Sequence, residues 1–445
     1  MSTDQPPSRE ELDPQLAPDA LMTTDSEKNT SNGAGHGAPS RTNTAPDGGL
    51  AAWSVVLGSW CVLFCSFGWI NSIGTFQSYY ERHLLRQYSA STIAWIPSLQ
   101  IFFIYAMGPV VGGLYDHFGP RWLVFVGSIL HVFGLMMASI STEYYQILLS
   151  QGVCSAIGVA IIFQPATSVI PGWFNQKRGA AYGVTTSGGS IGGVVFPIML
   201  QRLISDLGYG WVMRIAAFLI LFLLIIANLT IRSRVPPAPR PMSKNDMLQP
   251  FREVNMVLVI LGFILLTFGV FIPIDYLVIQ AMTEVHMSPG LAQYLLAILN
   301  AGSLFGRLGA GVFADYLGPY NVFVLVCYLA GILELALWIP ASSNAAIVVF
   351  AALFGFTSGA YVALAAALIV KVSPFQQIGY RIGLIFLCAS VSGLTTNPIA
   401  GAILSHNDGS YLGMKIFAGV LLLGGTTSIF GARLHQTGLH LLAKF

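Results

Sequence analysis

The sequence predicts an all-α membrane protein with twelve transmembrane helices in two six-helix halves. Three observations lead to this prediction. Charged residues make up 9% of the chain, against roughly 25% in ordinary soluble domains. Apolar runs long enough to cross a bilayer, about 20 residues each, follow one another along most of the sequence. A short motif also recurs at the same place in each half, after the second and the eighth run.

The composition excludes several classes of function. Hydrophobic residues form 54% of the 445 residues, and the formal net charge is +2. Because there is no basic stripe to neutralise phosphates, we expect no nucleic-acid partner. The five cysteines lie inside apolar stretches and lack the spacing of zinc ligands, so we expect neither disulfides nor a metal. No nucleotide-binding loop or catalytic cluster occurs, so the chain is not expected to be an enzyme or to hold a cofactor.

The polar segments divide the chain. Residues 1–45 are rich in Pro, Ser, Thr, Asn and acids and contain no aromatic residue, which is typical of a disordered tail. We expect this tail in the cytoplasm, without a cleavable signal peptide. A polar, proline-rich loop, 232–254, separates the two halves, 46–231 and 255–434, and residues 435–445 form a short cytoplasmic tail.

Lys and Arg predict the orientation of the helices. We expect the membrane helices at about Ala51–Tyr79, Thr92–Gly112, Trp122–Ile140, Tyr145–Val169, Ala180–Leu203, Val212–Ile231, Asn255–Thr283, Leu291–Ala314, Asn321–Pro340, Ala345–Val370, Ile382–Leu404 and Met414–Leu434. Of the 21 Lys and Arg residues, fifteen fall on the termini and the even-numbered loops and five on the opposite side. The positive-inside rule therefore places both termini in the cytoplasm, with the cell membrane as the expected location.

A glycine-rich stretch, Gly172–Gly193, is predicted to be a cytoplasmic turn that leads into a tightly packed transmembrane helix. It begins with the charged pair Lys177-Arg178 and continues with small residues every three to four positions. In lipid, small residues let two helix backbones approach closely.

The repeated motif indicates a transporter architecture. Gly112-Gly-Leu-Tyr-Asp116-His-Phe-Gly119-Pro120-Arg121 and Gly311-Val-Phe-Ala-Asp315-Tyr-Leu-Gly318-Pro319 have Gly, Asp, Gly and Pro at identical offsets. Two six-helix halves related by a parallel repeat are a plan of secondary transporters, which bind their substrate near the bilayer midplane between the halves.

The first copy of this motif resembles the signature of the major facilitator superfamily. In that family the Asp and Arg pair with helix ends and gate the cytoplasmic side. The resemblance implies a gating role for Asp116, Arg121, Asp315, Lys177 and Arg178. His117 replaces the commoner Arg, and the second copy has Tyr320 at the Arg position.

Two further motifs resemble the monocarboxylate porter family, in particular its fungal branch. They are Pro46-Asp47-Gly48-Gly49 followed by Trp53, and Trp173-Phe174-x-x-Lys177-Arg178-Gly179. In that family an Arg on helix eight is thought to bind the substrate carboxylate, which implies this role for Arg307. Proton-coupled members carry an Asp one turn earlier and a Lys on helix one; here these positions are Ser303 and Asn71.

Arg307 is also the leading candidate on physical grounds. An Arg in the middle of a membrane helix costs roughly 3 kcal/mol or more unless it faces water, a partner or a ligand. Its guanidinium group binds carboxylates in a bidentate fork. The alternative is a structural cation held by backbone carbonyls or by Asp315.

Other polar groups in the predicted membrane helices are weaker candidates. Asp275 and Glu334 are candidates for proton coupling, each with a purely structural role as the alternative. His131 is expected to be a packed histidine rather than a proton relay. The remaining candidates for substrate binding are Asn71, Ser303, Gln164, Tyr276, Tyr361 and Asn397; Gln77 on the first helix is a further polar group.

These features predict a secondary active or facilitative transporter that moves a small organic acid, a monocarboxylate-like metabolite, by alternating access. Its partners are then a small-molecule substrate, protons in a coupled cycle and the lipid bilayer, with a monomer as the default state. An efflux transporter for a secondary metabolite is the first alternative, and a carrier of a neutral solute such as a vitamin is the next. A sensor with a transporter fold and a membrane enzyme rank below these.

Overall fold

The structure is a computed structural model that describes most of the chain beyond the N-terminal tail. The described residues are 45–72, 76–77, 79–234, 243–440 and 443–444. The predicted disordered tail therefore lies outside them, except for its last residue. Within these ranges every regular element is a helix.

The described part of the first half contains thirteen helical segments. In order they are α1 (Leu50–Leu63), the π-helical η1 (Phe64–Gly68) and η2 (Tyr80–Leu84), α3 (Ala90–Ile93), α4 (Trp95–Ala106), α5 (Gly108–Phe118), α6 (Pro120–Ala138), α7 (Tyr144–Ile147), η3 (Leu148–Ser155), α8 (Ala156–Ser168), η4 (Ile170–Gly172), α9 (Arg178–Leu207) and α10 (Tyr209–Thr230).

The second half follows the central loop. Its elements are α11 (Lys244–Leu248), η5 (Gln249–Arg252), α12 (Val254–Thr283), α13 (Pro289–Ala292), α14 (Leu295–Leu317), α15 (Pro319–Leu333), η6 (Glu334–Trp338), α16 (Asn344–Lys371), η7 (Phe375–Gln377), α17 (Ile378–His406) and α18 (Leu412–Thr437).

The number of membrane helices agrees with the prediction. Eleven helical stretches in the described ranges are long and apolar enough to cross a bilayer, and the bent pair α4–α5 makes twelve when it counts as one span. Large apolar side chains such as Trp122, Phe222 and Leu229 remain exposed on the outer faces of these helices. This pattern is expected of helices whose outer faces contact lipid.

The second predicted span is broken rather than continuous. The sequence predicts one helix over Thr92–Gly112, but α4 ends at Ala106, α5 begins at Gly108 and the two axes differ by 41°. Pro109 follows directly and has no backbone N–H to continue the ladder, which is a common cause of a kink. The bend brings Gly108 against Gly383 of α17.

The first predicted span is also interrupted, although residues 76–77 and 79 beyond the interruption are helical. Asn71 and Ser72 form a turn, whereas the sequence predicts a helix up to Tyr79. The Ser72 N–H donates to the Trp69 carbonyl at 3.0 Å, and the Ser72 hydroxyl donates to the same oxygen at 2.5 Å. A serine hydroxyl that competes for a backbone carbonyl weakens the helix at this position.

The glycine-rich stretch forms α9, a helix that packs closely on both of its neighbours. A Cβ on Gly192 would lie 2.7 Å from the Gly68 Cα in η1, and a Cβ on Gly183 would lie 2.6 Å from the Arg307 carbonyl oxygen in α14. Both distances are far too short for a real side chain. Close approach therefore requires glycine at both positions, which confirms the predicted role of this helix.

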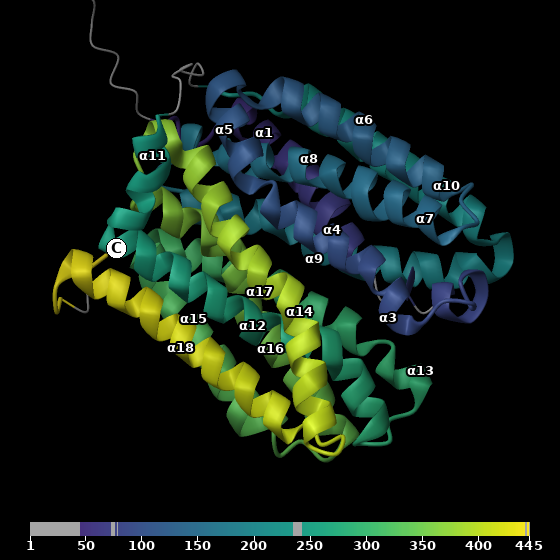
Figure 1. Ribbon diagram of the computed structural model, residues 1–445. Helices are drawn as coiled ribbons and strands as arrows, with labels where there is room; N and C mark the ends of the chain where they lie inside the picture. Colours follow the sequence, from purple (N-terminus) through teal and green to yellow (C-terminus); the bar gives the residue numbers. More distant parts are fainter. Residues whose placement is uncertain (1–44, 73–75, 78, 235–242, 441–442, 445) are drawn as a thin grey trace, which may run out of the picture. The chain divides into compact units, whose positions relative to one another are not determined.

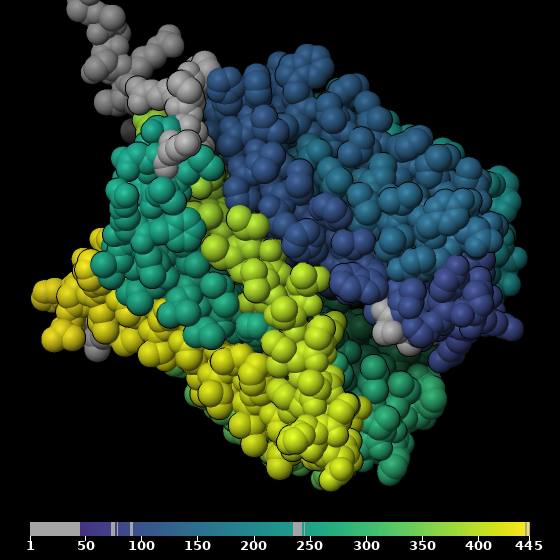
Figure 2. Space-filling view, viewed as in Figure 1, coloured from purple at the N-terminus to yellow at the C-terminus, as the bar shows by residue number. Residues whose placement is uncertain are grey.

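The two halves meet along two seams. One is formed by α9 and α14, and the other by α4 and α5 against α17. In Figure 1 the purple-to-blue helices of the first half and the green-to-yellow helices of the second form two neighbouring groups. Figure 2 shows yellow-green side chains of the second half directly beside the blue side chains of the first.

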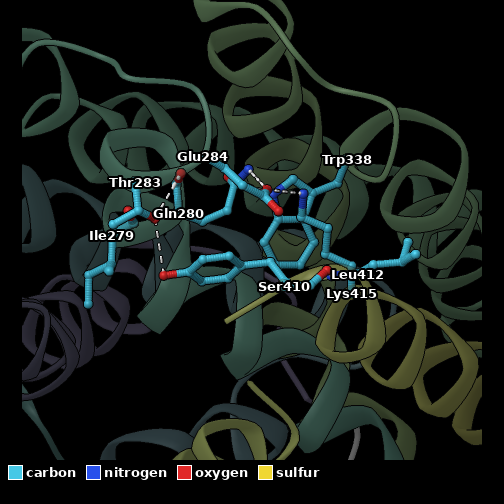
Figure 3. Close-up of polar contacts among 9 residues, drawn as sticks. Ile279, Gln280, Thr283, Glu284, Trp338, Ser410, Leu412 and Lys415 are labelled. Carbon is cyan, nitrogen blue, oxygen red and sulfur yellow. Dashed lines mark hydrogen bonds and ion pairs between the residues drawn. The ribbon is translucent and has the colours of Figure 1, made fainter. Parts of the chain in front are cut away.

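A polar cluster of Gln280, Glu284, Trp338 and Lys415 ties α12, η6 and α18 together at one end of the second half (Figure 3). Lys415 Nζ lies 2.8 Å from Glu284 Oε2, and Gln280 Nε2 donates to the same oxygen at 2.7 Å. Lys415 also lies over the Trp338 ring, 5.6 Å from its centroid. Partial burial would raise the pKa of Glu284, but hydrogen bonds from Lys415 and Gln280 outweigh it and hold this pKa below its ordinary value.

This ion pair predicts a pH-dependent contribution to stability. Because the pKa of Glu284 is lowered in the folded state, the contribution is present above the ordinary carboxyl pKa of about 4.3 and is lost as the pH falls through the lowered value. Glu284→Gln should therefore lower the melting temperature of the purified protein at neutral pH, by the equivalent of about 1 kcal/mol or less. The difference from wild type should shrink in acid.

Lys415→Met provides the control for this prediction. In a Lys415→Met background, Glu284→Gln should have little further effect, because the pair is already broken. An unchanged effect in that background would contradict the assignment of the stabilisation to the ion pair.

Candidate functional site

Two aspartates at one end of the molecule each cap a helix of the opposite half. Asp116 of α5 accepts hydrogen bonds from the N–H groups of Gly379, at 3.1 Å, and Tyr380, at 2.9 Å, in α17. Asp315 of α14 accepts from those of Gly179, at 2.6 Å, and Ala180, at 2.9 Å, in α9. The first N–H groups of a helix have no partner inside the helix and carry partial positive charge, which explains the choice of a carboxylate.

The other residues predicted to gate the transporter are placed differently. Arg121 and Lys177 are exposed, and Arg178 donates to the Phe174 carbonyl and to Asn175 within its own turn. Among the described side chains, none of these three cations forms an ion pair with a carboxylate. Gln164, predicted to bind substrate, also lies at this end, where its Nε2 donates to the Gly379 carbonyl at 3.0 Å.

Asp47 joins the two motifs that resemble the monocarboxylate porter family. Its Oδ1 accepts from the N–H groups of Asn175, at 2.6 Å, Gln176, at 2.7 Å, and Lys177, at 3.2 Å. Trp53 packs edge-on against Phe174 with the ring centroids 5.3 Å apart. Both motifs can be recognised in the sequence. Their contact cannot be predicted from it, because they are more than 120 residues apart.

The seam between α9 and α14 brings several predicted residues together. Arg307 Nε donates to the Ser303 hydroxyl at 3.1 Å, and Ser190 donates to the same hydroxyl at 3.3 Å. One turn away, a Cβ on Gly193 would lie 2.6 Å from Asn71 Nδ2 and 2.8 Å from Asn300 Oδ1. Ser303, Arg307 and Asn71 therefore line one seam, together with Asn300, which the sequence analysis did not select.

Arg307 has no anionic partner in this seam. It is almost fully buried, and its Nη1 donates to the Thr186 carbonyl at 2.5 Å. Within the described ranges no carboxylate lies within ion-pair distance, and Nη2 makes no hydrogen bond. The bond to the Thr186 carbonyl agrees with the alternative that Arg307 is a structural cation held by backbone carbonyls. Asp315, the other partner in that alternative, instead accepts hydrogen bonds from α9.

A second group of predicted residues meets between α12 and α17. The Asn397 side chain lies close to the Asp275 carboxylate. Tyr276 donates its hydroxyl to the Asn397 carbonyl at 3.1 Å. Asp275, Tyr276 and Asn397 therefore share one polar site within the second half. Asp275 is half-buried in this site.

The remaining candidates are scattered. The Tyr361 hydroxyl lies 2.8 Å from the Thr267 hydroxyl in the core of the second half. Glu334 is fully buried in η6, and its two carboxylate oxygens make no hydrogen bond with any described residue. His131 packs between α6 and η3 with Nδ1 2.8 Å from the Ser155 hydroxyl, as expected of a packed histidine. Gln77 donates to Glu81 at 3.0 Å.

Comparisons with known proteins agree with this architecture. The family model described as Major Facilitator Superfamily matches residues 58–280 and again 257–437. The fold is similar to that of the fucose:proton symporter FucP of E. coli, with a TM-score of 0.68 and 15% sequence identity over 84% of this chain and 98% of that one.

Similar curated proteins come from fungi. The MFS transporter asaE of Aspergillus flavus is 60% identical over 411 residues, which cover 92% of each chain. The fujikurins efflux protein of Gibberella fujikuroi is 52% identical and is aligned over 90% of this chain and 86% of its own length. The first of these relatives is described as an MFS transporter and the second as an efflux protein, and neither is described as a monocarboxylate porter. The chain belongs to the Major Facilitator Superfamily.

Proposed function

We propose that this chain is an efflux transporter that exports an acidic secondary metabolite across the cell membrane by alternating access. The observation that carries the proposal is the unpaired guanidinium of Arg307 in the seam between the halves. A buried cation without a counter-ion is costly. A ligand carboxylate at Nη2 and the adjacent nitrogen would remove that cost through a charge-assisted fork.

The neighbours of Arg307 support an anionic ligand. Ser303 and Asn71 stand where proton-coupled monocarboxylate porters carry an Asp and a Lys, so no nearby acid neutralises Arg307 and no second cation competes with it. Ser303 holds the guanidinium through Nε at 3.1 Å. A neutral solute such as a vitamin would leave the charge of Arg307 unpaired, which is why we rank that alternative below an acid.

The direction of transport is inferred from the relatives. Similar proteins are named as efflux proteins for fujikurins and for aspyridones. These names support the first alternative of the sequence analysis better than its leading prediction, a small monocarboxylate.

The predicted orientation of the helices determines the side from which the substrate would enter. With the termini in the cytoplasm, the Asp116 and Asp315 caps lie on the cytoplasmic side, so the substrate would enter when both caps release α17 and α9. Asp275 is our candidate for proton coupling, because it is a half-buried carboxylate close to Asn397. Glu334, fully buried in η6, is the second candidate.

Release of labelled acid from loaded cells tests the proposal. Yeast cells with this chain at the plasma membrane, and cells with an empty vector, are loaded with labelled 6-methylsalicylate, a polyketide acid, or with labelled lactate. After transfer to unlabelled buffer, we expect the chain to speed the release of 6-methylsalicylate and to leave lactate unchanged. Faster uptake of lactate with no change in the release of 6-methylsalicylate would instead support a monocarboxylate carrier.

A further inference from the structure

Five aromatic rings from five membrane helices converge between the two halves. Phe67 of η1, Tyr105 of α4 and Phe163 of α8 belong to the first half, and Phe271 of α12 and Phe386 of α17 to the second. Five leucine, isoleucine and valine side chains complete the same cluster. We call these five rings the aromatic cluster.

The rings contact one another in specific geometries. Tyr105 stacks on Phe386 with centroids 5.5 Å apart and planes at 12°, and it meets Phe271 edge-on at 6.5 Å. Phe163 meets Phe386 at 5.4 Å and Phe67 at 5.1 Å, both edge-on. Three of these four contacts join the first half to the second.

Three rings of the aromatic cluster are not fully buried. Phe67, Phe271 and Phe386 are only partly buried, although each of them contacts another ring of the cluster. The Gly108–Gly383 contact lies close by, three residues along the chain from Tyr105 and from Phe386. The cluster therefore lies directly beside the contact that closes the two halves.

Arg307 lies next to the aromatic cluster. A Cβ on Gly189 would lie 3.1 Å from Arg307 Nη1 and 3.1 Å from the Phe67 Cβ, so only a glycine separates the cation from the first ring. One ligand can thus reach the guanidinium and the rings at the same time.

We infer that the transported acid carries a planar aromatic or conjugated ring system, and that Tyr105, Phe271 and Phe386 select for it. This inference rests on the proposed function, since it describes the body of the acid whose carboxylate binds Arg307. When the halves separate, the contacts of Tyr105 with Phe386 and Phe271 must break, and a flat ring of the ligand can replace them. Aromatic pairs prefer offset stacked or edge-on geometry, which an aliphatic chain cannot satisfy.

The inference is tested on the purified full-length protein with three probes, which differ from one another in the ring or in the charge. They are 2-naphthoate, with a ring and an acid; octanoate, with an acid but no ring; and 2-naphthamide, with a ring but no charge. Binding is measured by isothermal titration calorimetry. We expect 2-naphthoate to bind at least about threefold to tenfold more tightly than octanoate, the range expected of an aromatic contact.

Phe271→Leu and Phe268→Leu form a matched pair of variants on α12. Both phenylalanines are half-buried, and each makes an edge-on ring contact, Phe268 with Phe417 at 6.1 Å. Only Phe271 belongs to the aromatic cluster. We expect Phe271→Leu to weaken 2-naphthoate by about threefold to tenfold and to leave octanoate unchanged, whereas Phe268→Leu should change neither. Phe386→Leu serves as the second variant if Phe271→Leu does not fold.

The outcomes separate the inference from the proposed function. Equal binding of octanoate and 2-naphthoate, or equal effects of Phe271→Leu and Phe268→Leu, would overturn the ring selectivity and leave an acid transporter. Equal binding of 2-naphthamide and 2-naphthoate would instead count against Arg307 as the acid site while the ring selectivity stands. Absence of binding by all three probes would overturn the inference, and the release assay would then decide separately on the proposed function.

Discussion

Gly383→Ala is expected to reduce efflux by about tenfold or more, because overpacking of a filled contact costs about 1–3 kcal/mol. A Cβ on Gly383 would overlap the Gly108 carbonyl oxygen, and it would lie only 2.6 Å from the Pro109 nitrogen. Both approaches are closer than van der Waals contact allows. Both neighbours are backbone atoms of the α5 N-terminus, so they cannot rotate away. The added methyl group should prevent α5 and α17 from closing and hold the transporter in the opposite state.

The release assay measures this effect, together with the amount of protein at the cell surface. Gly431→Ala in α18 is the control, because a Cβ there would meet only the Leu258 side chain, at 3.8 Å. It should transport like wild type. Normal efflux by Gly383→Ala at normal surface levels would show that this closed contact is not part of the transport cycle.

Arg307→Lys is expected to reduce efflux of 6-methylsalicylate by about tenfold or more, because a lysine is a single point charge and cannot form the bidentate fork. The positive charge remains, so the protein should still fold and reach the membrane. Arg307→Ala should lose at least as much activity.

Arg214→Lys is the matched control for this substitution. Arg214 is half-buried in α10, where it lies over the Trp211 ring at 4.9 Å and donates to Ser139 at 3.2 Å. It is remote from both seams, so its replacement should leave efflux unchanged. Unaltered efflux by both Arg307 variants would remove Arg307 from the site.

Much of the fold could be predicted from the sequence because lipid imposes simple rules. A membrane helix must satisfy its own backbone hydrogen bonds, so long apolar runs give the number of spans. The repeat around Asp116 and Asp315 predicts symmetric positions, and each aspartate indeed caps a helix of the other half. The close packing of α9 could also be predicted, because glycines let two membrane helices approach closely.

Local breaks could not be predicted from hydrophobicity alone. The bend at Met107 and the turn at Asn71–Ser72 lie inside apolar runs that read as continuous helices. Both depend on the hydrogen bonds of single residues, Pro109 and Ser72. Such details are set by one missing or competing donor and leave the mean hydropathy unchanged.

The candidate site could be predicted only in part. Arg307 stands out because a charge in a membrane helix is costly. The aromatic cluster does not stand out, since its five rings are separate phenylalanines and a tyrosine in a chain with 28 Phe and 17 Tyr. Their convergence depends on how five helices pack, which no local pattern contains. The same holds for Asn300 and for the contacts of Asp47.

The most direct test compares efflux of 6-methylsalicylate with that of its neutral amide, in wild type and in Arg307→Ala. If Arg307 binds the carboxylate during transport, wild type should prefer the acid by about tenfold or more, and Arg307→Ala should transport both compounds equally slowly. The same preference for the acid in wild type and in the variant would contradict the assignment of Arg307 as the acid-binding residue.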